Sequence, residues 1–480
     1  MIFTDAMQVA SLIEGEPIKK ERWIDVVNPF NGEVVGKVSL ASAEDAEQAI
    51  ESAYQAFHRT MKTMPAYRRS DILRKTAELL EERTEEFAQI LVLEAGKPIR
   101  DGRSEVGRAV QVLRFAADEA KKIGGELVPM DAAVGGENRI GMVRRRPIGV
   151  ISAITPFNFP LNLALHKIAP AIAAGNTVVL KPAGKTPLSA YKLVKLFEEA
   201  GLPKGALNLI IGNGSEVGDL LVSHPHISKI TFTGSPSVGI GLRQKAGLKR
   251  VTLELGSNSP NILFDDADSK AAAKGLVKGA FAFSGQVCIS AQRIYVQKGI
   301  YQQFLDEYVA LVNDLVIGDP AEESTDIGPM ITEEEAVRAH SWIQEAVKAG
   351  ASVATGGKRK GTMLEPTIMV DVTQDMKIVC EETFAPIVSV IPFETEEEVI
   401  AMANDSVFGL QAGVFTNDIN RAMRLADALE TGGVWINETS TYRQDNYPYG
   451  GIKNSGVGRE GVKYAMEDMT EIKFVGIKLG

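Results

Sequence analysis

The sequence predicts an α/β protein built on a parallel, doubly wound sheet. From Ile148 onward, short apolar runs alternate with segments of helical spacing, which is typical of βαβ units. The run TVVLKP is apolar throughout, as expected for a strand that is buried on both faces. The 480 residues also include 45 Gly and 21 Pro, which suits frequent junctions between strands and helices.

The composition is that of a globular protein and argues against several classes of function. Hydrophobic residues make up 45% and charged residues 24% of the chain, which argues against disorder. The net charge of −10 disfavours binding to nucleic acid or to anionic membranes. We find no secretory signal pattern and no apolar run of about 18 residues that could span a membrane. With only two cysteines, we expect no disulfide framework and a cytoplasmic location.

The first third of the chain predicts strands followed by long helices. Apolar positions at helical spacing predict three helical segments that cover a sheet. The strands fall within Trp23–Val38, around a turn at Asn31-Gly32, and the helices begin at Ser42 and cover Ala66–Glu94 and Arg103–Lys122. The cluster Arg144-Arg145-Arg146 follows, and we interpret it as a solvated edge between domains or subunits.

The middle of the chain supplies the alternating strands and helices, and a second unit begins after Leu255. Predicted strands include GVISAIT, TVVLKP, ALNLIIG and KITFTG in the first unit, and RIYVQ, IVSVIPF and GGVWIN in the second. The chain finishes on an alternating strand in MEDMTEIKFVGIKL. Together with residues 127–143, this strand could form an edge that pairs with another subunit.

Cys288 is the candidate nucleophile. A lone cysteine is usually a buried structural residue, and we interpret Cys380 in KIVCEETF in this way. Cys288 lies in FSGQVCISAQR, where small and polar neighbours predict a loop leading into a helix. A helix N-terminus lowers the pKa of a thiol and makes it nucleophilic. Cysteine hydrolases pair this nucleophile with a histidine, but no histidine here has a context that suggests a base.

Glu254 ends the apolar run VTLEL, where an unused carboxylate is costly to bury. Either it accepts backbone hydrogen bonds at the end of a strand, or burial raises its pKa and it acts as a general base.

Further on, TFTGSPSVG follows a strand and opens a helix, so Gly234 and Ser235 could approach a pyrophosphate. Lys181 lies at the carboxyl end of another strand, where its cation could meet a ribose or a phosphate. The pair His224 and His226 lacks any accompanying ligand motif, and we assign no metal site.

Taken together, these segments resemble the aldehyde dehydrogenase superfamily over nearly the whole chain. Its markers occur in the family's order: TPFNFP, KPAGKTP, FTGSPSVG, LELGSNSP, GQVCIS, EETFAP and PYGGIKNSG. The resemblance implies a Rossmann-type cofactor domain in residues 1–124 and 148–256, and an α/β catalytic domain in residues 257–453. It also implies β-strand oligomerisation arms in residues 125–147 and 464–480, and a homodimer or homotetramer.

The resemblance also implies a reaction, the oxidation of an aldehyde to a carboxylic acid with hydride transfer to NAD or NADP. The Cys288 thiolate would attack the aldehyde, and the Asn158 amide with the Cys288 backbone N–H would form the oxyanion hole. After hydride transfer, Glu254 would activate the water that hydrolyses the thioester. The remaining site residues would contact the cofactor: Pro156, Lys181, Gly184, Gly234, Ser235, Glu382 and Phe384.

The sequence departs from the family pattern at three places, and the first bears on the cofactor. Gly184, followed by Lys185, stands where many NAD-preferring relatives have a glutamate that would repel a 2′-phosphate. Its absence makes NADP a plausible cofactor and leaves the choice open. The motifs LELGS, with Ser257, and FAP, with Ala385, carry small substitutions that we expect the site to tolerate.

The segment STYRQDNYPYGG resembles the branch that contains lactaldehyde, succinate-semialdehyde and non-phosphorylating glyceraldehyde-3-phosphate dehydrogenases. Tyr442 and Arg443 would lie on a loop near the substrate mouth, where Arg443 either binds an anionic tail or forms a structural salt bridge. Two alternatives stay open. A CoA-acylating semialdehyde dehydrogenase would generally lack Glu254, and a catalytically silent protein of this fold would bind cofactor without turnover.

Overall fold

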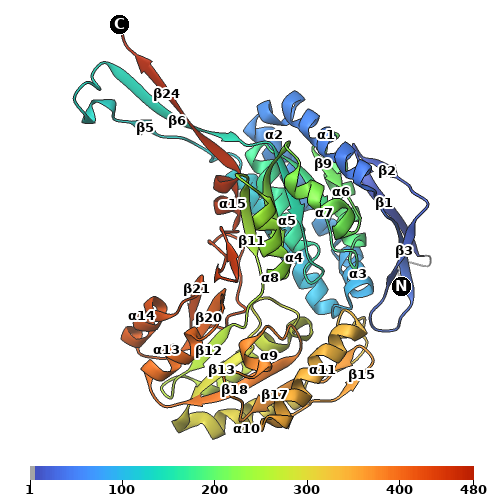
Figure 1. Ribbon diagram of the computed structural model, residues 1–480, viewed down its shortest axis with the longest axis vertical. Coiled ribbons are helices and arrows are strands. Elements are labelled where there is room, and N and C mark those ends of the chain that lie inside the picture. The colour runs from blue at the N-terminus through green and yellow to red at the C-terminus, as the bar shows by residue number, and fades with distance from the viewer. Residues whose placement is uncertain (1–5) are drawn as a thin grey trace.

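The computed structural model describes residues 6–480, which form two α/β lobes and a projecting arm (Figure 1). The first lobe holds a ten-stranded sheet in the order β23-β11-β10-β7-β8-β9-β1-β4-β3, with β2 paired to β1. Its strands are β1 (Met7–Ile13), β2 (Glu16–Ile18), β3 (Trp23–Val27), β4 (Val34–Ser39), β7 (Val150–Ile154), β8 (Thr177–Lys181), β9 (Leu207–Leu209), β10 (Ile227–Thr233), β11 (Arg250–Glu254) and β23 (Gly456–Val457). Strands β7 to β11 are parallel, as predicted.

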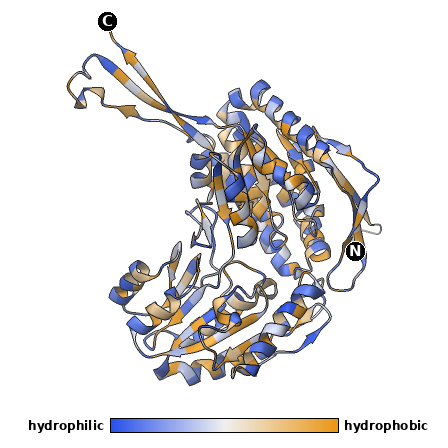
Figure 2. Cartoon of the chain, in the orientation of Figure 1, coloured by the Kyte–Doolittle hydropathy of each residue, from blue (hydrophilic) through white to orange (hydrophobic). Residues whose placement is uncertain are grey.

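Helices cover both faces of this sheet, so successive residues of its central strands face different cores. In β8, Val178 and Leu180 join one core and Val179 joins the other. The helices on one face are α1 (Ala43–Arg59), α7 (Gly214–Ser223) and α8 (Pro236–Lys245). On the other lie α2 (Ala66–Glu82), α3 (Thr84–Ala95), α4 (Ile99–Glu119), α5 (Asn162–Ala174), α6 (Leu188–Glu199) and α15 (Val462–Asp468). Because both faces are buried, strands such as β7 and β8 are mainly apolar, and Figure 2 shows hydrophobic segments in the interior of this lobe.

The second lobe is a seven-stranded sheet in the order β14-β17-β18-β13-β12-β20-β21, also covered on both faces. Its strands are β12 (Pro260–Leu263), β13 (Arg293–Gln297), β14 (Ser352–Thr355), β17 (Thr367–Val370), β18 (Ile387–Phe393), β20 (Gln411–Phe415) and β21 (Gly433–Ile436). Its helices are α9 (Ser269–Phe281) and α10 (Tyr301–Asn313) on one face, and α11 (Glu333–Lys348), α12 (Lys377–Cys380), α13 (Glu396–Asn404) and α14 (Ile419–Ala428) on the other. Two small ladders complete the lobe: β15 (Arg359–Lys360) with β16 (Met363–Leu364), and β19 (Phe408–Gly409) with β22 (Ile452–Lys453).

The arm consists of β5 (Leu127–Val128), β6 (Arg139–Pro147) and β24 (Thr470–Lys478). Strands β6 and β24 pair antiparallel from Thr470 opposite Pro147 to Lys478 opposite Arg139, and they extend away from both lobes (Figure 1). No helix within residues 6–480 is long and apolar enough to cross a membrane.

A buried ion pair joins the helical layer to the loop that follows β7. The side chains of Lys97 and Glu105 form this pair with no solvent exposure. Lys97 Nζ also donates to the carbonyl oxygen of Asn158 at 2.7 Å, and Glu105 accepts from the backbone N–H groups of Leu161 and Asn162 at 3.0 Å each. The pair therefore fixes both the start of α5 and the backbone at Asn158.

Glu105→Ala should lower the free energy of unfolding by about 3–5 kcal/mol, because it leaves the Lys97 ammonium buried without a counterion. The midpoint of urea denaturation measures this effect. Glu82→Ala, at the exposed end of α2, is the matched control and should leave the midpoint nearly unchanged. Equal shifts in the two variants would contradict the assigned role of the ion pair.

Candidate active site

The loop that carries Cys288 is held in a strained conformation. Phe283, Ser284 and Gly285 have φ values of 47°, 54° and 68°, all in the left-handed region. A Cβ on Gly285 would collide with the carbonyl oxygen of Ala385, so only glycine fits there. The two residues other than glycine, Phe283 and Ser284, store strain that the surrounding structure must hold, and such strain concentrates at functional sites.

Cys288 does not lie at the start of a helix, and that prediction was wrong. It follows the short 3₁₀ turn η3 (Ala282–Gly285) and precedes β13. The small residues that suggested a helix entry serve instead to form the left-handed turns. Gln286 holds the loop in place by accepting from the Ile331 N–H at 2.9 Å and by donating to the carbonyl oxygen of Phe283 at 3.3 Å.

Tyr449 supplies the polar contact of the Cys288 thiol. Burial raises the pKa of Cys288 to about 11, and a hydrogen bond with the Tyr449 hydroxyl, at 3.3 Å from Sγ, counteracts that rise. The guanidinium of Arg443 lies 3.5 Å from the centre of the Tyr449 ring, and its positive charge also lowers the pKa of the thiol. Stabilisation of the thiolate therefore depends on a tyrosine and an arginine that the sequence interpretation did not connect with Cys288.

Asn158 and Glu254 lie at the carboxyl ends of β7 and β11, where a parallel sheet exposes its ligand-binding edge. The Asn158 amide donates to the carbonyl oxygen of Gln286 at 2.9 Å. Both carboxylate oxygens of Glu254 are buried without a hydrogen-bond partner among residues 6–480. Burial and the nearby charge of Glu460 raise the pKa of Glu254 well above its usual value. The alternative in which Glu254 accepts backbone hydrogen bonds is therefore wrong.

One cavity of about 560 Å³ brings the predicted catalytic residues together with most of the cofactor residues. Cys288, Glu254 and Asn158 line it, and so do Pro156, Lys185, Gly234, Ser235, Glu382 and Phe384. Lys181, Gly184, Tyr442 and Arg443 are not among its lining residues. Lys181 ends β8 with its Nζ 3.5 Å from the Pro182 carbonyl oxygen, and burial lowers the pKa of its ammonium.

The cavity suits a dinucleotide. Ser235 occupies the N-cap position of α8, and the backbone N–H groups that follow Pro236 provide an anion site beside Gly234. A Cβ on Gly234 would collide with the Phe232 ring. Glu382 accepts from the Ser257 N–H at 2.9 Å, and burial raises the pKa of Glu382 to about 7. Phe384 lines the same cavity and lies in edge contact with Phe157, with the ring centroids 5.9 Å apart.

Arg443 belongs to a buried ionic cluster rather than to an exposed loop. Its side chain is 7% exposed, and its Nη2 donates to Glu460 at 2.8 Å. Glu460 also accepts from Lys167 at 2.8 Å and lies 3.1 Å from the Nδ1 of His166. Burial would raise the pKa of Glu460, but the charges of Lys167, His166 and Arg443 outweigh it and hold that pKa below its ordinary value. Tyr442 is 38% exposed and packs against Trp435.

Two more charged residues complete this cluster, which is defined by Arg108, His166, Lys167, Arg443, Asp445 and Glu460. Arg108, on α4, donates to Asp445 at 2.8 Å, and the same oxygen lies 2.7 Å from His166 Nε2. The sequence interpretation missed Arg108, His166, Lys167, Asp445 and Glu460. Lys167 and His166 lie on the fully buried α5, and charged residues in so apolar a helix were the signal that could have found them.

No group of His, Cys, Asp and Glu side chains within the described part of the chain has an arrangement that could hold a metal ion. His224 and His226 contact Glu47 and Glu51 of α1 instead, at 2.9 and 3.3 Å.

Comparison with known proteins gives a consistent result. Residues 16–475 match the sequence model of the aldehyde dehydrogenase family. A 3-sulfolactaldehyde dehydrogenase from Priestia megaterium is 46% identical over 99% of each chain. The crystal structure of aldehyde dehydrogenase 21 from Physcomitrella patens, in complex with the reaction product succinate, superposes with a TM-score of 0.96, 39% identity and 99% coverage of each chain.

Glyceraldehyde-3-phosphate dehydrogenase GapN from Methanocaldococcus jannaschii, complexed with NADP, gives a TM-score of 0.92 at 43% identity, covering 96% of this chain and 100% of that one. These matches span essentially the whole length of the chain and so include both lobes. The chain therefore belongs to the aldehyde dehydrogenase family, whose members oxidise aldehydes with NAD or NADP.

Proposed function

We propose that this enzyme oxidises a small, hydroxylated aldehyde with an anionic end to the corresponding carboxylic acid. The observation that carries the reaction is the single cavity lined by Cys288, Glu254, Asn158 and the cofactor residues. Support for the substrate class comes from the relatives, which are named for 3-sulfolactaldehyde and glyceraldehyde 3-phosphate or hold succinate. All three compounds carry an anionic group.

Each catalytic residue has one task. The Cys288 thiolate adds to the aldehyde carbon and forms a thiohemiacetal, while the Asn158 amide and the Cys288 backbone N–H stabilise the oxyanion. NAD or NADP, held in the cavity by Ser235, Glu382 and Phe384, would accept a hydride from the thiohemiacetal, and the acyl group would remain on Cys288 as a thioester. Glu254 takes a proton from water, which attacks the thioester and releases the acid and the thiolate. Burial raises the pKa of Glu254, so its carboxylate form is a stronger base toward this water.

We assign recognition of the anionic end to Arg108, because the guanidinium of Arg443 is only 7% exposed and already paired with Glu460. Both guanidinium groups approach Asp445, and the buried Nε of each has no hydrogen-bond partner in the described chain. Arg443 also lies against Tyr449, the residue that contacts Cys288. An unpaired N–H on a guanidinium is a strong donor for a carboxylate, sulfonate or phosphate oxygen. Arg108, which is 28% exposed, is the more accessible of the two.

Either NAD or NADP fits the chain, and we propose that the enzyme accepts NADP. Gly184 is exposed, and a Cβ added there would meet nothing within 4 Å, so the position leaves room for a 2′-phosphate. Lys185 follows it and lines the cofactor cavity, where its charge would favour the phosphate.

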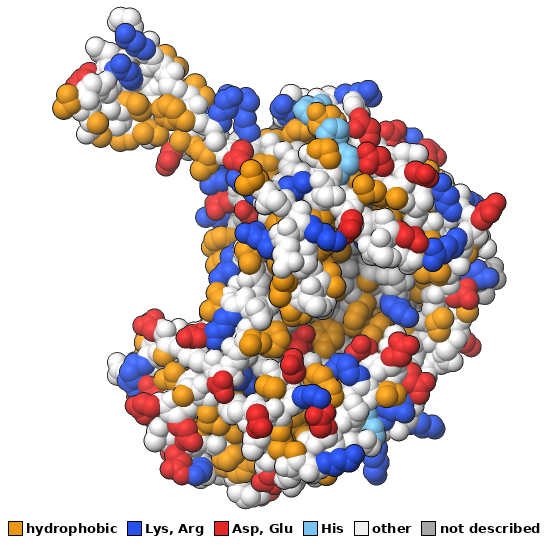
Figure 3. Space-filling model, viewed as in Figure 1, with side chains coloured by type: hydrophobic (Ala, Val, Ile, Leu, Met, Phe, Trp, Pro, Cys, Tyr) orange, Lys and Arg blue, Asp and Glu red, His pale blue; other side chains and the backbone are white. Residues whose placement is uncertain are grey.

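We propose that the chain assembles into a homodimer or homotetramer through the arm. We also propose a cytoplasmic location, because the two free cysteines suit a reducing compartment. Leu127, Ile140, Ile472, Phe474 and Ile477 are between 41% and 77% exposed, and Figure 3 shows apolar side chains along the arm. An apolar strand ladder that extends into solvent is a ready surface for a second copy. Light scattering of the purified chain should give a mass of two or four times 51.8 kDa. A monomeric mass would contradict this assignment.

Reduced-nicotinamide absorbance at 340 nm tests the substrate class, with each aldehyde assayed against NAD and NADP. The enzyme should prefer anionic hydroxyaldehydes to propionaldehyde, and Cys288→Ala should abolish turnover. Arg108→Gln should raise KM for the anionic substrate about tenfold or more, because a charged hydrogen bond is lost, and should leave KM for propionaldehyde nearly unchanged. Arg114→Gln, an exposed arginine of the same helix, is the control. An equal loss for both aldehydes would refute the role of Arg108.

Tyr449→Phe tests the stabilisation of the thiolate. Because the hydroxyl favours the charged form of Cys288, its removal should raise the pKa of the thiol. At pH 8, alkylation of Cys288 by iodoacetamide should then be about tenfold slower, as followed by mass spectrometry of its peptide. Tyr447→Phe is the matched control, since that hydroxyl bonds to Gln411 at 3.0 Å instead. An unchanged rate and pH profile in Tyr449→Phe would exclude this role.

A further inference from the structure

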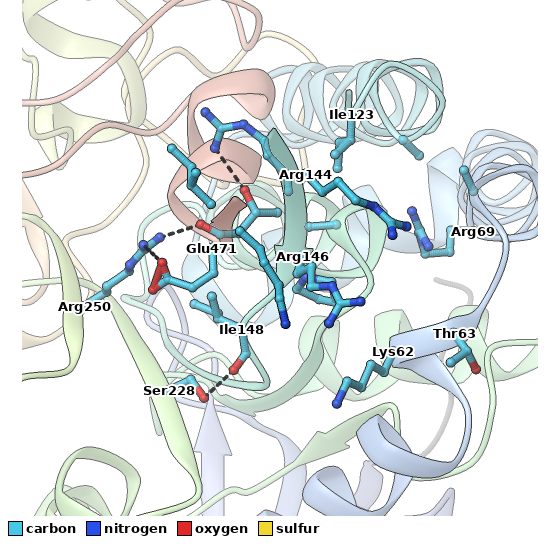
Figure 4. A pocket seen from close by; sticks show the side chains of 18 of the residues that line it. Lys62, Thr63, Arg69, Ile123, Arg144, Arg146, Ile148, Ser228, Arg250 and Glu471 are labelled. Carbon is cyan, nitrogen blue, oxygen red and sulfur yellow. Dashed lines mark hydrogen bonds and ion pairs between the residues drawn. The ribbon is translucent and has the colours of Figure 1, made fainter. Parts of the chain in front are cut away.

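A cavity of about 1020 Å³ at the root of the arm belongs to the surface that we assign to assembly (Figure 4). Arg144 and Arg146 of β6 line it, and the exposed Ile140 lies on the same face of that strand. A second copy on the arm would therefore meet this cavity. The catalytic cavity of about 560 Å³, by contrast, is lined by residues from both lobes of one chain.

Residues 381–386, which we call the cofactor strap, carry Glu382 and Phe384 between α12 and β18. The strap forms no helix or strand of its own. Phe384 has a φ of 46°, in the left-handed region that side chains other than glycine rarely adopt. A strained conformation of this kind persists only where the surrounding structure holds it. The contacts that the strap receives from outside therefore determine where its two cofactor residues lie.

Gln292, at the end of the Cys288 loop, contacts the strap on both sides of Glu382. Its Nε2 donates to the carbonyl oxygen of Glu381 at 2.6 Å and to that of Ile378 at 3.1 Å. Its Oε1 accepts from the Thr383 N–H at 3.0 Å. The side chain is buried, and both N–H groups and the oxygen of its amide are used. These bonds fix the orientation of the amide and, with it, the backbone before and after Glu382.

Arg338 of α11 holds the other side of the same peptide. Its Nη2 donates to the carbonyl oxygen of Thr383 at 2.7 Å, so both backbone groups of Thr383 are bonded to side chains from outside the strap. Arg338 also lines the catalytic cavity, where a cofactor can contact it directly. Gln292 is not among the lining residues, so its influence on a cofactor must pass through the strap.

The strap is also joined to the segment that carries the nucleophile. Gly285 precedes Cys288 by three residues, and Gln292 follows it by four. The backbone of Gly285 packs tightly on the strap, since a Cβ there would lie 2.1 Å from the carbonyl oxygen of Ala385. The strap thus contacts the chain on both sides of Cys288, once through close packing and once through the Gln292 amide.

We propose that Gln292 is a positioning residue that sets Glu382 and Phe384 for binding NAD or NADP. The inference rests on the proposed function, in which these two residues hold the cofactor. Without the Gln292 amide, the backbone on both sides of Glu382 loses its partners, and the strained Phe384 is free to relax. Cys288 keeps its own contact with Tyr449, so the nucleophile stays in place while the cofactor residues shift.

Isothermal titration calorimetry of the full chain with NAD and with NADP tests the inference without any aldehyde. Gln292→Met keeps an unbranched side chain but removes the hydrogen bonds, and it should weaken cofactor binding about tenfold or more. Asn404→Leu is the matched control, because the Asn404 amide also bridges two backbone groups of this lobe, those of Ala428 and Glu430 at 2.9 and 2.8 Å. The control should bind both cofactors like the unmodified chain, although the midpoint of urea denaturation should fall in both variants.

Gln292→Asn is the second variant: it keeps an amide in the buried position but is one carbon shorter, and it should also weaken binding. Alkylation of Cys288 by iodoacetamide should proceed at the unmodified rate in both Gln292 variants. Glu382→Gln separates the inference from the proposed function, because it removes the charge of a cofactor residue directly and should weaken binding as well.

If the unmodified chain binds neither cofactor, or if Glu382→Gln binds as the unmodified chain does, the cofactor role of Glu382 fails and the inference falls with it. If Glu382→Gln weakens binding but the folded Gln292 variants do not, only the inference is overturned. It is also overturned if alkylation of Cys288 slows as much as cofactor binding weakens, because the whole site would then be distorted.

Discussion

The buried carboxylate of Glu460 is the interaction on which the catalytic arrangement depends. It joins Lys167 and His166 of α5 to Arg443 of the C-terminal segment, at 2.8 to 3.1 Å. Without it, three cationic or polar groups would lie buried with too little compensation, at a cost of several kcal/mol. Because Arg443 then lies against Tyr449, the same carboxylate also fixes the group that contacts the nucleophile.

Electrostatic control of the site is therefore indirect. Glu460 raises the pKa of Glu254, and Arg443 lowers the pKa of both Glu254 and Cys288, so the two members of one ion pair act on the base and the nucleophile. On the other side, the Lys97 and Glu105 pair holds the backbone at Asn158. The Glu460 ion pairs and the Lys97–Glu105 ion pair both lie between the helical layer and the ends of the parallel strands. A small displacement there would move several catalytic groups together.

Sequence reasoning succeeded where local pattern and topology coincide. Apolar runs identified β7, β8, β10 and β11, and the rule that ligands bind at the carboxyl ends of parallel strands gathered Glu254 and Gly234 correctly. The resemblance to a family supplied the tasks of Asn158 and Cys288. The local sequence pattern failed at the Cys288 loop, because small residues favour helix starts and left-handed turns alike. The segment expected to be helical over Ala66–Glu94 divides at Arg83 into α2 and α3.

The sequence by itself determined the fold class, the strand-end residues and the chemical type of the nucleophile and base, because these follow from periodicity and side-chain chemistry. Only the tertiary structure decided their partners. Arg443 meets Glu460 and His166, which lie 17 and 277 residues away in the sequence. Whether a charge is paired, shielded or available to a ligand depends on distance and burial, and those quantities exist only once the chain has folded.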